Sequence, residues 1–137
     1  MPKIFGLNLA AVLAASVAFY FVGFLWYGLI FSDIWMAEMG IPASAMEEGQ
    51  NPLWMVGGFV ITVMQAVGIG LVLKWKSAAN MNAAIMAALI LWITIAVPFA
   101  AYGYLYGVAH SLTLFMIDAS HLLVGWVVSA IILSLIK

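Results

Sequence analysis

The stretch that decides the fold is Leu112–Lys137, which reads LTLFMIDASHLLVGWVVSAIILSLIK. It is almost unbroken apolar sequence, and a helix needs roughly 20 such residues to cross a bilayer. One acid, Asp118, and one histidine, His121, interrupt the run. Because they are three residues apart, the two side chains share one face of a helix. This pair is where we expect chemistry in the chain.

The composition excludes a water-soluble domain. Of 137 residues, 68% are hydrophobic and 7% are charged, whereas soluble domains carry about 25% charged residues. The net charge is −1 and there is no arginine, so the clustered cations that neutralise nucleic-acid phosphates are missing. Without cysteine, disulfides and thiolate chemistry are excluded. We expect one transmembrane domain over residues 1–137, with the lipid bilayer as its surroundings and no nucleic-acid partner.

Four stretches are long and apolar enough to span a membrane, at about residues 7–31, 53–73, 83–106 and 112–136. They are about twice the length of a barrel strand and do not alternate, which excludes a β-barrel. Pro98 should kink the third span because it lacks an N–H group. The sequence therefore predicts an all-α, integral membrane four-helix bundle.

The polar segment between the first two spans predicts a short helix on the outer side. Ser32 can cap it, and Gly40 should end it. Ser44 and Glu47 add the spacing of a capping box further along the segment.

The start of the chain imitates a signal peptide, with Lys3 ahead of an apolar run and Ser16, Val17 and Ala18 as a cleavage site. The apolar run continues well past Ala18, however. We therefore expect the first span to be retained.

The lysines predict the topology. With the N-terminus in the cytoplasm, Lys3, Lys74, Lys76 and Lys137 all fall on the cytoplasmic side, as the positive-inside rule requires. The N- and C-termini are therefore predicted to be cytoplasmic, and the acidic loop after the first span faces outward.

Aromatic residues gather toward the predicted outer side, and two interpretations stay open. They can form an interfacial belt, or they can wall an outer cavity that holds an apolar or cationic ligand. The residues in question are Trp26, Tyr27, Trp35, Trp54, Tyr102, Tyr104 and Tyr106.

The carboxyl group of Asp118 needs a partner, because a charge at the bilayer centre costs roughly 2.5–3.5 kcal/mol. His121 is the first expected partner, with Tyr27 and Tyr102 as further donors. The pair can be a proton relay, a ligand anchor, half of a metal site or a structural hydrogen bond. Gln65, in the middle of the second span, is expected to form an interhelical hydrogen bond or to belong to a polar path.

No metal, cofactor or enzymatic activity is expected from these residues. Two ligands at this spacing do not make a metal site. Hydrolysis needs a nucleophile, a base and a group that orients the base, and Ser120 points about 100° away from His121 on a helix.

Three segments together resemble a bacterial membrane family, the domain of unknown function DUF1761. They are Asn8–Ala15 (NLAAVLAA), Gly23–Tyr27 (GFLWY) with Phe31, Trp35 and Gly40 after it, and Leu114–Leu122 (LFMIDASHL). The resemblance covers essentially the whole chain, although the middle two spans match in hydropathy more than in motif. It implies a four-helix integral membrane protein without a known activity, and it points to Asn8, Trp26, Tyr27, Trp35, Asp118 and His121.

Taken together, these observations predict a multi-pass protein of the bacterial inner membrane. We expect a non-enzymatic accessory or interaction subunit that forms a homo-oligomer or joins a larger membrane complex. The alternative is a small transporter, or a protein that conducts protons or ions through Asp118 and His121. The polar residues are few, which favours the first interpretation over a continuous hydrophilic path.

Overall fold

The computed structural model describes residues 2–41, 52–107 and 110–136. Within these residues, four helical stretches are long and apolar enough to cross a membrane: Leu9–Ile30, Pro52–Trp75, Met81–Tyr106 and Leu112–Leu135. The predicted fold class is therefore confirmed, and the ends of the spans differ from the expected ones by a few residues. The capping box expected at Ser44 and Glu47 lies outside the described residues, as does Lys137.

The chain begins with a small hairpin that the sequence did not predict. Strands β1 (Lys3–Ile4) and β2 (Leu7–Asn8) pair antiparallel, with Lys3 opposite Asn8. Asn8 then caps helix α1 (Leu9–Gly23), because its Oδ1 accepts a hydrogen bond from the backbone N–H of Ala10 at 2.9 Å. The first span consequently starts two residues later than expected.

The first span continues without a break into a π-helical segment, η1 (Phe24–Ile30). The short helix predicted after it is present as α2 (Ser32–Met39). The expectation that Ser32 caps it is wrong, because Ser32 is its first helical residue and no side chain of the described residues caps its start. Gly40 ends this helix in the left-handed conformation, with φ of 71°, as the sequence predicted.

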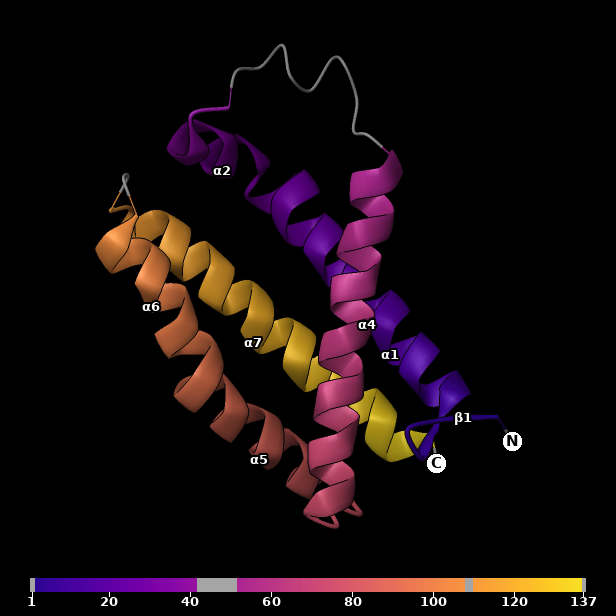
Figure 1. Cartoon of the computed structure of the whole chain (residues 1–137). Helices are drawn as coiled ribbons and strands as arrows, with labels where there is room; N and C mark the ends of the chain where they lie inside the picture. Colours follow the sequence, from indigo (N-terminus) through magenta and orange to yellow (C-terminus); the bar gives the residue numbers. More distant parts are fainter. Residues whose placement is uncertain (1, 42–51, 108–109, 137) are drawn as a thin grey trace.

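The other spans are α4 (Pro52–Trp75), the compound helix α5 (Met81–Leu91), η2 (Trp92–Ala96) and α6 (Val97–Tyr106), and finally α7 (Leu112–Leu135). The π-helical segment η2 ends just before Pro98, where the kink was predicted, and the ribbon bends through this region (Figure 1). The bend of the third span is therefore accommodated by the π-helical turns of η2 as well as by Pro98.

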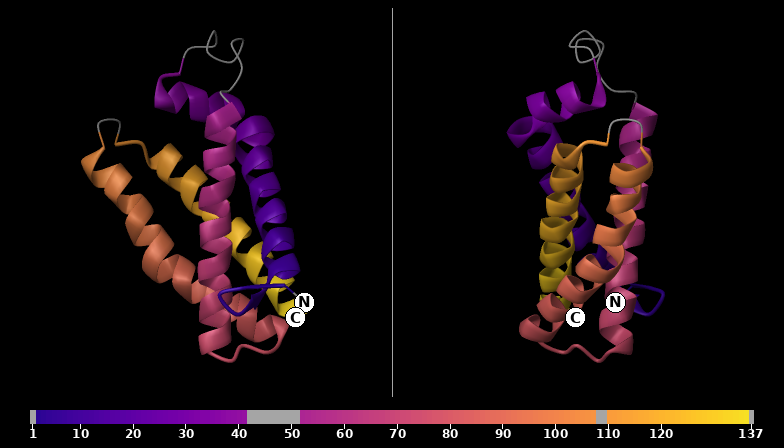
Figure 2. Two further views of the ribbon diagram at one scale, coloured as in Figure 1. Left: turned by 45° about the vertical axis from the view of Figure 1, so that its right-hand side comes forward. Right: turned by 90° about the vertical axis from the view of Figure 1, so that its left-hand side faces the viewer.

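Helix α7 is the central element, because it packs against α1, α4 and the α5–α6 helix (Figures 1 and 2). Both ends of the chain lie at one end of the bundle, and α2 lies at the other. The termini are therefore on the same side, as predicted. Their cytoplasmic location stays a prediction.

Small residues of α1 and α7 are buried where these two helices pack together. Ala15 and Ser16 on α1 are fully buried, as is Ser129 on α7. Between them, the ring of Phe19 lies directly on Gly125, where any side chain would overlap its ring atoms. In lipid, where no hydrophobic force drives helices together, such close packing holds a bundle. Gly125 and Ser129 of α7 are thus both buried in this interface.

The contact between Gly125 and Phe19 predicts a specific loss of stability. Gly125→Ala should lower the free energy of unfolding by about 1–3 kcal/mol, because the added methyl group overpacks the helix interface. Thermal unfolding in one detergent, followed by circular dichroism, measures this.

Gly68→Ala is the matched control, since a Cβ atom at Gly68 in α4 meets nothing within 4 Å. Its melting temperature should stay at or slightly above that of the wild type. Equal losses in both variants would mean that the contact between Gly125 and Phe19 does not decide the result, since alanine favours the helix more than glycine does at both positions.

Candidate functional site

The carboxylate of Asp118 on α7 is bound by a tyrosine from the facing helix. The hydroxyl of Tyr27, on η1, donates a hydrogen bond to Oδ1 of Asp118 at 2.5 Å. The expectation that His121 is the partner of Asp118 is wrong, since their side chains share no hydrogen bond in the described part of the chain. The imidazole instead packs between two rings, with its centroid 5.0 Å from that of Tyr27 and 5.5 Å from that of Phe19.

Tyr27, rather than His121, donates to Asp118 because of where η1 lies relative to α7. Because η1 faces α7, it presents an O–H donor across the helix interface toward the carboxylate. The His121 ring is held on the same face of α7 as the carboxylate, against the aromatic side chains of the first span. The pair therefore lies on one face, as predicted, but each member has its own partner.

The neighbouring residue of η1 makes a second bond to α7. The indole Nε1 of Trp26 donates to Oγ of Ser120 at 2.9 Å, and this hydroxyl donates to the carbonyl of Ile117 at 3.0 Å. Two consecutive aromatic residues, Trp26 and Tyr27, thus tie the π-helical segment to one stretch of α7. The wider turn of a π-helix changes which side chains share a face, and such turns are frequent at functional sites.

A pocket of about 570 Å³ opens beside this cluster. It is formed by α1, η1, α2, α4 and α7, which meet at the end of the bundle where α2 lies (Figure 1). Most of its wall is aromatic or methionine side chain, with a few polar groups. Its lining residues are Phe19, Tyr20, Gly23, Phe24, Tyr27, Gly28, Ser32, Trp35, Met36, Met55, Thr62, Asp118 and His121.

The sequence left two interpretations of the aromatic residues open, an interfacial belt and the wall of a cavity, and different residues suit each of them. Tyr27 and Trp35 line the pocket and contact each other edge to face, with centroids 5.5 Å apart. Trp54 and Tyr106 are 75% and 80% exposed, which suits an interfacial belt. Some of these aromatic residues therefore form a pocket wall, and others are exposed as the belt interpretation expects.

Three of the predicted site residues do not line this pocket: Trp26, which bonds Ser120, and Gln65 and Tyr102. Oε1 of Gln65 accepts a hydrogen bond from the indole Nε1 of Trp126 at 2.9 Å, which confirms the expected interhelical bond between α4 and α7. Tyr102 is 63% exposed and stacks on Tyr106. The expectation that Tyr102 donates to Asp118 is wrong, because the splayed α6 carries this ring on its exposed side.

Sequence reasoning missed several residues that shape the site. Gly23 lies against the imidazole, since a Cβ atom there would be 3.2 Å from Nε2 of His121. Phe19 closes the inner end of the pocket, and Met36 and Thr62 complete its sides. The spacing of Phe19, Gly23 and Tyr27 at four residues is the one signal that places them on a common face. Among the described residues, no group of three or more His, Cys, Asp or Glu side chains is placed to hold a metal ion.

The fold and the site define a protein with four membrane-length helices and an aromatic pocket between them, in which a tyrosine binds a carboxylate of the last helix. The family model described as "Protein of unknown function (DUF1761)" matches residues 10–134. The chain belongs to this family, as its motifs predicted. Comparison with curated proteins and with solved structures found no match.

The hydrogen bond between Tyr27 and Asp118 predicts a non-additive pair of substitutions. Tyr27→Phe should cost about 1–3 kcal/mol of unfolding free energy, because it leaves a carboxylate in the helix interface without its donor. Adding Asp118→Leu to this variant should restore most of the loss, since both polar groups are then gone. Chemical or thermal unfolding in detergent measures each step.

Tyr102→Phe serves as the control for removing a tyrosine hydroxyl and should leave stability within about 0.5 kcal/mol of the wild type. If the two substitutions at positions 27 and 118 simply add, the hydrogen bond contributes nothing to the fold.

Proposed function

We propose that this chain is a non-enzymatic accessory protein of the bacterial inner membrane, which holds an apolar group bearing a positive charge in the pocket beside Tyr27 and Asp118. The occupant is a small lipophilic cation or the corresponding side chain of a membrane partner. The observation that carries the proposal is the combination of aromatic walls with a single carboxylate in a pocket of about 570 Å³. Aromatic faces and a carboxylate both attract cations, and aromatic walls bury apolar groups.

The carboxylate has capacity left for a ligand. Tyr27 donates its hydrogen bond to Oδ1 of Asp118. Within the described residues, no side chain or backbone group donates a hydrogen bond to Oδ2. An ionised carboxylate offers about four lone-pair sites. A cation in the pocket therefore meets an acceptor that is already oriented by the tyrosine.

The surroundings of Ser120 support binding rather than hydrolysis. Its hydroxyl donates to the carbonyl of Ile117 and accepts from the indole of Trp26. It is therefore turned away from His121, and these residues do not form the bonded nucleophile and base that covalent catalysis needs.

Phe19 favours binding over transport. Its ring is 1% exposed, lies against His121 and fills the space over Gly125. Beyond this ring the next buried polar groups are two serine hydroxyls. Ser16 is bonded to the carbonyl of Val12 at 2.7 Å, so Phe19 interrupts the polar face below the pocket.

One observation favours the alternative, a small transporter or proton-conducting protein. The hydroxyl of Ser129 is buried without a partner in the described residues, and it lies on the same face of α7 as Asp118 and His121. Movement of the Phe19 ring would then connect this hydroxyl with the pocket.

The lysines support the proposed membrane orientation. Lys3, Lys74 and Lys76 belong to segments at the end of the bundle where the chain begins and ends, whereas Asp33 and Glu38 lie on α2 at the other end. The positive-inside rule then places the termini in the cytoplasm and the pocket toward the outer face.

Native mass spectrometry in a mild detergent tests the proposal with tetraphenylphosphonium as the probe. The wild type should bind one cation per chain, and Asp118→Asn should weaken binding at least about fivefold, because one charge is lost from the pocket. Asp33→Asn, which removes an exposed acid of α2 that does not line the pocket, should leave the affinity unchanged. Equal affinity in all three proteins would contradict the proposed site.

The same spectra report the assembly. An accessory subunit should appear as a homo-oligomer or with a second membrane protein in stoichiometric amount. If the chain appeared only as a monomer without a partner, even in the mildest detergents, the accessory role would be contradicted. The binding of tetraphenylphosphonium would not be affected by this result.

Proton flux into liposomes separates the proposal from the alternative. We expect liposomes with the wild-type chain to leak no faster than liposomes without protein, because Phe19 interrupts the polar face. If the wild-type chain made the liposomes leak protons faster and Asp118→Asn abolished this leak, transport rather than binding would be the function.

A further inference from the structure

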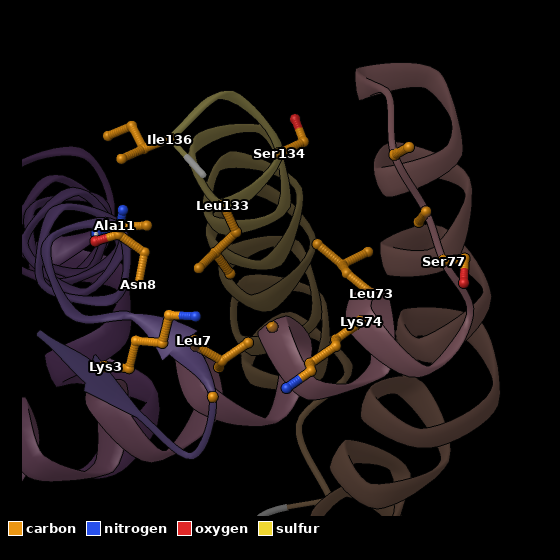
Figure 3. A pocket seen from close by; sticks show the side chains of 14 residues that line it. Lys3, Leu7, Asn8, Ala11, Leu73, Lys74, Ser77, Leu133, Ser134 and Ile136 are labelled. Atoms are coloured by element: carbon orange, nitrogen blue, oxygen red, sulfur yellow. Dashed lines mark hydrogen bonds between the residues drawn. The ribbon is translucent and has the colours of Figure 1, made fainter. Parts of the chain in front are cut away.

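A second pocket, of about 530 Å³, lies at the opposite end of the bundle from the one beside Tyr27. It is formed by the β1–β2 hairpin, the end of α4 with the turn that follows it, and the end of α7 (Figure 3). These are the parts of the structure that carry the described lysines.

Two lysine side chains from distant parts of the sequence converge on this pocket. Figure 3 shows Lys3 of β1 and Lys74 of α4 reaching toward Leu7, which lies between them. The ammonium of Lys74 lies directly against Gly6, where a Cβ atom would overlap it. Gly6 has φ of 80° and leaves this space open, so the hairpin turn accommodates the cation.

The two positive charges have no protein counter-charge in the described part of the chain. Neither ammonium forms an ion pair there, and none of the lining residues is an acid. Both lysines are exposed, and like charges that line one pocket repel each other. An anion between them would offset this repulsion, because both ammonium groups would attract it.

The rest of the pocket is suited to an amphiphile. Its floor is apolar and comes from three elements, through Leu7, Leu73 and Leu133. Ser77 and Ser134 are also among its lining residues. Aromatic side chains mark the level of the headgroups: Phe5 and Trp75, which adjoin the lining, are 72% and 75% exposed.

We infer that this pocket binds the phosphate of an anionic phospholipid, with Lys3 and Lys74 on the phosphate and the acyl chains along the apolar floor. Basic pockets between transmembrane helices bind anionic headgroups in this way. The site requires neither the Tyr27 pocket nor its proposed ligand, and it lies in the leaflet on the lysine side.

Native mass spectrometry of the whole chain in a mild detergent, titrated with phosphatidylglycerol or phosphatidylcholine, tests this inference. The wild type should retain phosphatidylglycerol in preference to phosphatidylcholine. Lys3→Gln and Lys74→Gln should each weaken phosphatidylglycerol binding about fivefold, and Lys74→Arg should preserve it because the charge remains.

Lys76→Gln is the matched control. Lys76 follows α4 at the same end of the chain, is exposed, and does not line the pocket. This variant has the same net charge as Lys74→Gln and should bind phosphatidylglycerol like the wild type. Equal weakening in both variants would overturn the site in favour of diffuse surface charge.

Inorganic phosphate distinguishes the two sources of the anion. Millimolar phosphate should leave bound phosphatidylglycerol in place, because the apolar floor contributes to lipid binding. Complete displacement by phosphate would overturn the lipid assignment and identify a site for a free anion. Equal retention of phosphatidylcholine would also overturn it, since the lysines would then play no part.

Discussion

The constraint on which the site depends is that Asp118, in an otherwise apolar helix, must receive a hydrogen bond from within the protein. Lipid offers no donor, and an unsatisfied polar group there costs several kcal/mol. Tyr27 supplies the bond from the first span, so η1 has to lie beside α7 at this level. The second bond, from Trp26 to Ser120, holds the same two segments together. The π-helical turns of η1 belong to this arrangement, because consecutive aromatic residues both reach α7.

The position of the pocket follows from a change in residue size along the helix interface. At the end where the chain begins, alanine and serine let α1 and α7 approach closely, and Phe19 fills the space over Gly125. Beyond Phe19, large rings replace the small residues on the first span. Rings that are tethered by hydrogen bonds do not interdigitate as alanines do, so the space between the helices stays open beside Tyr27 and Asp118.

Hydropathy and capping signals were sufficient to predict the four spans, the short helix that Gly40 ends, and the bond made by Gln65. These features depend on local sequence or on the cost of one polar group in lipid. The partner of Asp118 depends on the rotation of the first span relative to α7, which the π-helical turns alter. The sequence favoured His121, three residues away on the same helix, over Tyr27 and Tyr102, and nothing local identifies Tyr27 as the partner. The hairpin at Lys3 was missed because two-residue strands carry no periodic signal.

Charge is so scarce in this chain that the placement of each charged group is informative. At one end of the bundle, Tyr27 donates to one oxygen of Asp118, and aromatic rings surround the carboxylate. At the other end, Lys3 and Lys74 line a pocket that has no acid among its described lining residues. Moving a lysine next to the acid would have neutralised both in an ion pair. Instead, the fold keeps the opposite charges at opposite ends, each beside a pocket with apolar walls. Such a separation leaves each charge able to bind a ligand of the opposite sign, a cation beside Asp118 and an anion between the lysines.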